Sequence, residues 1–145
     1  MNPTHRLSFI MAVALALAAG VTTPAQAMAP TRIEQGTVAG TGIVDRADGD
    51  AHLTLSHRCN RVATGRVRGT LRQRVGETFI AQGFVFRRVT CSTSSSDVSL
   101  GFRPFDDIAF GEGPATVSLR LRVCSGQPRT CTRRHITREV LLAFP

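Results

Sequence analysis

Arginines at alternate positions are the residues of this chain whose type and spacing could do chemistry. In an extended strand, alternate side chains point to the same side, about 7 Å apart. Each guanidinium carries a fork of donors that fits a phosphate or a carboxylate. The sequence therefore predicts an anion-binding face if the two strands that carry these arginines are neighbours. The candidate residues are Arg66, Arg68, Arg72 and Arg74 on one strand and Arg120 and Arg122 on another.

A second interpretation of the arginines is that they follow from composition and from the needs of an exposed sheet face. The chain has 18 basic residues and no lysine, and a formal net charge of +8. A GC-rich genome favours arginine codons over lysine codons, and a half-buried antiparallel sheet needs charged residues on its outer face. The arginine rows are then simply a solvated surface. Either way, a strongly basic protein attracts polyanions at low salt.

The four cysteines are expected to form two disulfides. Cys59 and Cys91 each fall on the apolar side of an alternating segment, so they can meet in the core. Cys124 falls on the arginine side, and Cys131 follows after six intervening residues. We therefore predict the pairs Cys59–Cys91 and Cys124–Cys131. The alternatives are a Cys59–Cys124 bridge and a zinc site with Cys124, Cys131 and His135, whose spacing fits no common zinc pattern.

The first 27 residues have the features of a secretory signal peptide. Arg6 precedes an apolar run over residues 7–19, and the segment ends in Ala25-Gln26-Ala27, an A-x-A cleavage pattern. The run is shorter than the roughly 20 residues that a membrane span needs. We expect a cleaved and released extracytoplasmic product with no membrane span, in a compartment where disulfides persist.

Beyond residue 27, the pattern predicts a single all-β domain. Residues 28–39 are expected to form a loose arm or an edge strand, and residues 40–145 a domain of short strands separated by turns. Gly83 should introduce a bend or bulge, and no window after the signal peptide has helical periodicity. Spacing of this kind favours an antiparallel immunoglobulin-like β-sandwich. The expected strands are 40–46, 51–59, 66–75, 78–91, 98–102, 115–124 and 136–144.

The chain resembles small secreted proteins of unknown function from high-GC Gram-positive bacteria, in which a signal peptide precedes one immunoglobulin-like domain. The similar segments are residues 53–59 (LTLSHRC), 63–65 (ATG), 89–91 (VTC) and 113–115 (GPA). The resemblance implies a sandwich with a Cys59–Cys91 bridge. It implies no activity and no catalytic residues. The second cysteine pair and the many arginines depart from that pattern.

Catalysis is not expected. His52, His57 and His135 lie in no sequence context typical of a nucleophile elbow, a zinc-protease helix or a phosphate loop. No cofactor or metal is expected. The chain is predicted to be a secreted, non-enzymatic binding domain whose partner is an anionic cell-envelope polymer or another secreted protein.

Two further expectations concern partners. A specific nucleic-acid partner is not expected, because the eight phenylalanines are the only aromatic residues and none is expected to interleave with the arginine rows as a stacking platform. The alternative function is protease inhibition. A loop closed by Cys124–Cys131 would then present Arg129 to the cleft of a trypsin-like protease, and its preorganisation would lower the cost of binding.

Overall fold

The computed structural model describes residues 29–145, so the expected signal peptide (residues 1–27) lies outside the described residues. Eight strands account for most of this part of the chain, and the alternating segments of the sequence coincide with most of them. None of the elements that the structure describes is a helix of the length and apolar character needed to cross a membrane. The strands are β1 (Ile33–Val38), β2 (Thr41–Val44), β3 (Ala51–Cys59), β4 (Ala63–Val75), β5 (Phe79–Cys91), β6 (Ser96–Pro104), β7 (Gly113–Ser125) and β8 (Thr130–Ala143).

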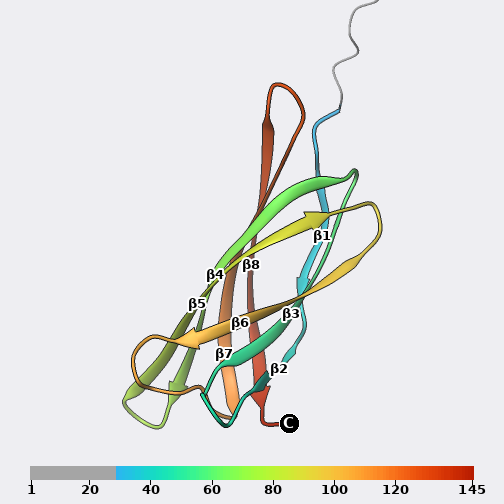
Figure 1. Cartoon of the computed structure of the whole chain (residues 1–145). Coiled ribbons are helices and arrows are strands. Elements are labelled where there is room, and N and C mark those ends of the chain that lie inside the picture. Colours follow the sequence, from blue (N-terminus) through green and yellow to red (C-terminus); the bar gives the residue numbers. More distant parts are fainter. Residues whose placement is uncertain (1–28) are drawn as a thin grey trace, which may run out of the picture.

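The strands close into a β-barrel, and the immunoglobulin-like sandwich expected from the sequence is wrong. The hydrogen-bonded order is β1-β3-β2-β8-β7-β4-β5-β6, and β3 also pairs with β6. Seven strands therefore form a ring, while β1 continues the pairing of β3 beyond β2. The ring exists because β2 pairs in parallel with the end of β8 and because β6 pairs with both β3 and β5. Figure 1 shows the strands wrapped around a common interior.

Alternation along each strand separates the barrel interior from the surface. On β4, Val67 and Leu71 are fully buried, whereas Arg68 and Arg72 are exposed. The same alternation holds on β7, where the residues from Ala115 to Val123 are buried at every second position. Burial of these apolar side chains is the main stabilising contribution, at about 25 cal/mol for each Å² removed from water. The inside and outside faces predicted for these two strands are confirmed.

Glycines allow β4 to approach its neighbour closely. A Cβ atom built on Gly69 would lie 2.4 Å from the carbonyl oxygen of Ser118, and one on Gly65 would lie 2.8 Å from that of Arg122. Both glycines face the interior side of the wall between β4 and β7. A larger side chain at either position would push the two strands apart.

The bulge expected at Gly83 is not present. The β4–β5 ladder runs without a register shift from Ala63↔Cys91 to Val75↔Phe79, with Gly83 opposite Leu71. Instead, the absence of a side chain at Gly83 lets β6 approach β5 closely. A Cβ atom there would lie 2.7 Å from the carbonyl oxygen of Arg103 on β6.

One end of the barrel is closed by the loop between β6 and β7. Phe110 of this loop is buried in the core. Gln73, a buried polar residue on β4, donates from Nε2 to the Gly111 carbonyl oxygen (2.8 Å) and accepts from the Gly111 N–H at Oε1 (2.9 Å). This paired contact fixes the loop and satisfies a polar side chain that would otherwise be costly to bury.

At the other end, a disulfide joins strands that are not hydrogen-bonded to each other in a ladder. The β5–β6 ladder contains only two pairs, Gly83↔Pro104 and Phe84↔Arg103. Beyond it, the predicted Cys59–Cys91 disulfide, which is confirmed, connects β3 to β5. His57 is buried nearby, and its Nε2 lies 3.2 Å from the Thr90 carbonyl oxygen. The disulfide therefore holds the barrel together where the ladder has ended.

Two arginines outside the predicted rows have a structural role. Arg134 and Arg138 extend from β8 and donate to the carbonyl oxygens of Glu34 and Val38 on β1. The Leu141 N–H donates to the Gly40 oxygen at 2.8 Å. The two arginines attach β1 to β8, although these strands share no ladder, and the Gly40 contact attaches the link between β1 and β2.

We predict that Gly69→Ala destabilises the protein by about 1–3 kcal/mol, because the new methyl group must displace the β7 backbone. Chemical denaturation followed by circular dichroism measures this change. Gly111→Ala is the matched control, since a Cβ atom at Gly111 would have no neighbour within 4 Å. Equal stability of the two variants would contradict the close packing of β4 against β7.

We predict that Gln73→Ala also destabilises the protein by about 1–3 kcal/mol, because both backbone groups of Gly111 lose their partner. The exposed Gln127→Ala is the control and should leave the unfolding midpoint unchanged. Hydrogen exchange adds a local measure. The Gly111 amide should lose its protection in Gln73→Ala, and retained protection would show that this contact does not fix the loop.

Candidate anion-binding groove

Strand β4 lies between β5 and β7, and the three strands together with β8 bring the predicted arginines onto one outer face. β4 is antiparallel to both neighbours and β7 is antiparallel to β8, with no register shift in any of the three ladders. Residues that are directly opposite one another therefore form rows across four strands. The condition set by the sequence, that the two arginine strands adjoin, is met.

The rows concentrate positive charge. One row is Arg88–Arg66–Arg122–Arg133, running from β5 through β4 and β7 to β8. The next row along β4 is Phe86–Arg68–Arg120–His135. Adjacent strands are about 4.8 Å apart, and successive rows on one face are about 7 Å apart. Like charges directly opposite each other destabilise a sheet, so this arrangement is one that stability alone would disfavour.

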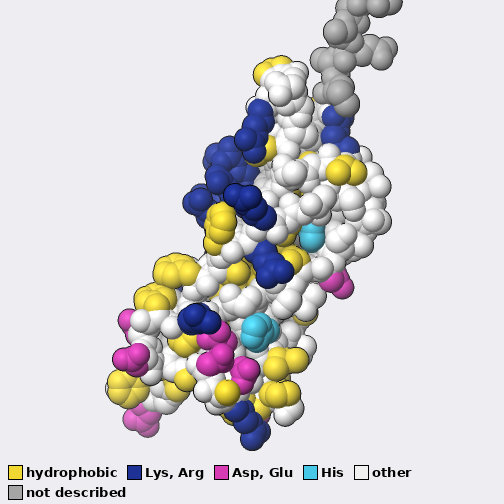
Figure 2. All heavy atoms as spheres, viewed as in Figure 1, with side chains coloured by type: hydrophobic (Ala, Val, Ile, Leu, Met, Phe, Trp, Pro, Cys, Tyr) yellow, Lys and Arg dark blue, Asp and Glu magenta, His cyan; other side chains and the backbone are white. Residues whose placement is uncertain are grey.

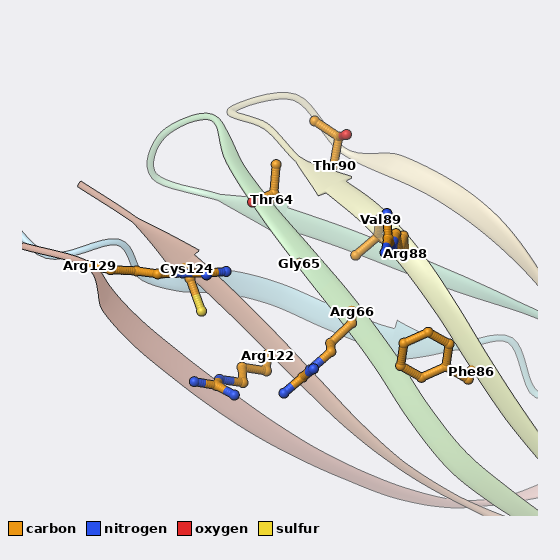
Figure 3. A pocket seen from close by; sticks show the side chains of 10 residues that line it. All are labelled: Thr64, Gly65, Arg66, Phe86, Arg88, Val89, Thr90, Arg122, Cys124 and Arg129. Carbon is orange, nitrogen blue, oxygen red and sulfur yellow. The ribbon is translucent and has the colours of Figure 1, made fainter. Parts of the chain in front are cut away.

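Two hollows follow each other along this face, and we call them together the arginine groove. The first has a volume of about 670 Å³ and contains Arg66, Arg88, Arg122 and Arg129. In Figure 3 the Arg66 side chain extends from β4 toward Arg122 on β7, and Phe86 lies beside it on β5. The second hollow has a volume of about 390 Å³ and is lined by residues that include Arg68, Thr70, Phe84, Arg120 and His135.

The charges of the groove are not neutralised from within. Arg68 has the largest effect on Arg66 and lowers its pKa below the ordinary arginine value. Partial desolvation and the charges of Arg122, Arg129 and Arg133 lower the pKa of Arg66 further. In residues 29–145 the ion pairs are Arg58–Glu34 and Arg103–Asp50, and neither includes a groove arginine. The groove is therefore a concentrated, uncompensated positive field.

Arg122 is half-buried, like Arg66, and one of its donor atoms is fully enclosed. One terminal nitrogen lies 3.3 Å from Sγ of Cys131, a weak acceptor. Its Nε atom is buried and has no hydrogen-bond partner among the residues that the structure describes. An unpartnered donor on a cation is costly to enclose. A bound anion would offset part of this cost by placing negative charge beside the guanidinium.

A disulfide-closed hairpin forms one end of the groove. Cys124 and Cys131 are directly opposite each other on β7 and β8, and the predicted bridge between them is confirmed. Since both cysteines are bonded to each other, they cannot act as thiolate ligands of zinc. The turn between β7 and β8 carries Arg129, whose side chain lines the groove. Its expected role in a protease-inhibiting loop stays a prediction.

The predicted anion-binding set divides into two parts. Arg66, Arg68, Arg120 and Arg122 line the groove. Arg72 and Arg74 lie farther along β4, opposite Gln82 and Ile80 on β5. Arg88 was not predicted as a member of this set, although the alternation of residues 85–91 places it outside. Arg133 was not predicted either, because the last strand was expected to begin at residue 136 rather than at Thr130.

Aromatic side chains interleave with the arginines in space. Phe86 is directly opposite Arg68, and the Arg68 guanidinium carbon lies 5.3 Å from the centre of its ring. Phe84 stacks on Phe105, with ring centres 5.0 Å apart and planes within 6°. The premise that no aromatic residue accompanies the arginines is therefore wrong. Phe86 and Arg88 on β5 lie opposite Arg68 and Arg66 on β4, a relationship that the linear sequence does not display.

The charges of the barrel are separated from end to end. Figure 2 shows basic side chains gathered toward the end with the β7–β8 hairpin and acidic ones toward the opposite end. Loops at that opposite end contain most of the acidic residues: Asp45, Asp48, Asp50, Glu77, Asp106, Asp107 and Glu112. An anionic ligand is thus attracted more strongly to the end with the β7–β8 hairpin.

The histidines considered for catalysis do not form a cluster. His57 is buried on β3, and His52 is exposed on the same strand but on its other face. His135 lies on the outer face of β8, opposite Arg120. Among residues 29–145, no group of three or more His, Cys, Asp or Glu side chains is arranged to hold a metal ion.

We predict that Arg66→Gln raises the thermal unfolding midpoint at low ionic strength, because it relieves repulsion from Arg68 and Arg122. The gain should disappear in about 0.5 M salt, where exposed charges are screened within a few Å. Differential scanning calorimetry at both salt concentrations measures this effect. Arg32→Gln, an exposed arginine outside the groove, is the control. If the unfolding midpoint of Arg66→Gln were lower than that of the unmodified protein by the same amount at both salt concentrations, Arg66 would stabilise the fold.

Comparison with models of protein families finds no match to this chain, and neither do comparisons with curated proteins and with solved structures. The resemblance to secreted bacterial proteins therefore stays a prediction. The case for a function rests on the geometry and charge of the groove.

Proposed function

We propose that this chain is a secreted binding domain that holds a linear anionic polymer in the arginine groove. The observation that carries the proposal is the row Arg88–Arg66–Arg122–Arg133, in which four cations face one another without an acidic partner. A bound polyanion would supply the missing negative charge. Arginine forks would bind its phosphate, sulfate or carboxylate groups through charge-assisted hydrogen bonds.

The shape of the groove supports an extended ligand over a single small anion. The two hollows run along β4 from Thr64 to Thr70. Six residue steps of about 3.3 Å give a length of about 20 Å. Successive rows of arginines along this length would contact successive charges of one polymer.

The two disulfides support an oxidising location such as the extracytoplasmic space. Anionic polymers of the cell envelope are abundant there and remain the partner class expected from the sequence. Binding would need no cofactor and no chemical step.

The test compares the groove with basic residues elsewhere. We predict that replacing Arg66, Arg88, Arg122 and Arg133 together by Gln lowers the affinity for a polyphosphate of about 20 units at least tenfold at 150 mM salt. The control is the quadruple variant Arg32, Arg46, Arg72 and Arg74 to Gln. It removes the same charge from exposed positions outside the groove and should retain most of the affinity.

Isothermal titration calorimetry at several salt concentrations measures both affinity and salt dependence. The groove variant should also have a flatter salt slope, because fewer counterions are released when fewer charges are contacted. Equal losses in the two quadruple variants would show that net charge alone, and not the groove, determines binding. Absence of binding by the unmodified protein at 150 mM salt would refute the proposed function.

A further inference from the structure

Phenylalanines flank the arginine groove on β5. Phe84 and Phe86 are each 59% exposed, and Phe105, which stacks on Phe84, is 52% exposed. Phe86 lines the first hollow and Phe84 the second. A binding site for a simple charged chain, such as a polyphosphate, would gain nothing from these rings. Exposed rings beside arginines suit a ligand that has flat apolar faces as well as charges.

Hydrogen-bond donors outnumber acceptors in the groove, because arginine is the most frequent side chain that lines it. The guanidinium groups of Arg66, Arg68, Arg120 and Arg122 can donate but cannot accept. The other polar side chains that line the two hollows are threonines, Ser118 and His135, and none is a carboxylate or an amide. A glycan would bring many hydroxyl donors, which need acceptors. A phosphodiester backbone brings acceptors only, so it matches this lining.

Charge near the outer phenylalanines disfavours an anionic lipid surface. Phe105 is followed directly by Asp106 and Asp107, and Phe79 follows Glu77 by two residues. Insertion of these rings into an anionic membrane would bring carboxylates to its surface. A strand lying along β4 avoids these acids, because the groove ends near Thr70.

We propose that the ligand of the groove is a single-stranded nucleic acid, bound without sequence preference. The phosphates lie along the arginine rows, and unpaired bases stack on Phe86 and Phe84, the two rings that line the groove. Such combinations of a basic track and aromatic rings are how proteins hold single strands, since every base has a stacking face. This inference rests on the proposed function and specifies its ligand.

The test separates stacking from charge. Fluorescence anisotropy compares a labelled 15-residue oligothymidine with a 15-residue abasic strand that has the same number of phosphates. The full secreted chain should bind oligothymidine about tenfold more tightly than the abasic strand at 150 mM salt, as expected for one or two stacked bases. The double variant Phe84→Leu, Phe86→Leu should lose this preference and keep its affinity for the abasic strand within twofold.

The control variant is Phe79→Leu, which changes a residue that is 60% exposed at the start of β5 but does not line the groove. It should keep the tenfold preference. Circular dichroism and disulfide mapping check that all variants are folded. A blunt DNA duplex of 15 base pairs should bind no more tightly than the abasic strand, because its bases are already stacked.

Each contrary result has a defined meaning. Equal affinity for oligothymidine and the abasic strand in the unmodified chain would overturn the inference and leave polyanion binding intact. An equal loss of affinity for oligothymidine and for the abasic strand in the double variant would also overturn it. So would loss of the preference for oligothymidine in the Phe79→Leu variant. The unmodified chain could instead bind phosphatidylglycerol vesicles more tightly than oligothymidine and lose this binding in the double variant. That result would overturn the inference and identify an anionic membrane as the ligand. Failure to bind any polyanion would refute the proposed function and this inference together.

Discussion

Closure of the barrel depends on β3, because both ends of the rolled sheet meet on this strand. One edge of β3 pairs with β1 and β2, and the other edge pairs with β6 over seven residues. Its last residue is bonded covalently to β5 through the Cys59–Cys91 disulfide. These contacts join segments far apart in the sequence, and they let β4, β7 and β8 present an uninterrupted outer wall. The groove exists only because that wall is held in place from the opposite side of the ring.

The wall of β4, β7 and β8 is stabilised by apolar burial on its inner face and destabilised by charge repulsion on its outer face. Each arginine that faces out alternates with an apolar residue that faces in, so the rows that repel one another are fixed by the burial of Val67, Leu121 and their neighbours. Apolar burial of a side chain stabilises by about 1.5–3 kcal/mol, more than an exposed charge pair typically costs. The fold can therefore hold like charges together at positions where a ligand would relieve the repulsion.

The sequence was sufficient to predict what depends on local alternation. Strand β3 was predicted from Ala51 to Cys59, where the structure has it, and both disulfides followed from the side of the strand on which each cysteine lies. The ring closure was not predicted. A sandwich and a barrel have the same alternation, and they differ in which strands pair at the ends. Pairing of Thr41 with Leu141 joins residues that no local pattern relates.

The groove was predicted only in part for the same reason. Arg66 and Arg122 were each predicted to lie on the outer face of their own strand. That they lie directly opposite each other depends on the β4–β7 register. Phe86 and Arg68 are distant in sequence and adjacent in space, so a search for interleaved aromatics along the chain could not find them. Arg133 was not predicted, because the last strand was expected to begin at residue 136. The ladder in fact continues to Ser125↔Thr130.

The separation of charge along the barrel gives the molecule a large electric dipole. A polyanion exerts a torque on such a dipole and turns the basic end toward itself before contact. Encounters in the wrong orientation are thereby suppressed, and association is faster than for a protein of the same net charge spread evenly. The acidic loops around Phe110, although they lie outside the groove, would thus help to determine how quickly a polyanion reaches it.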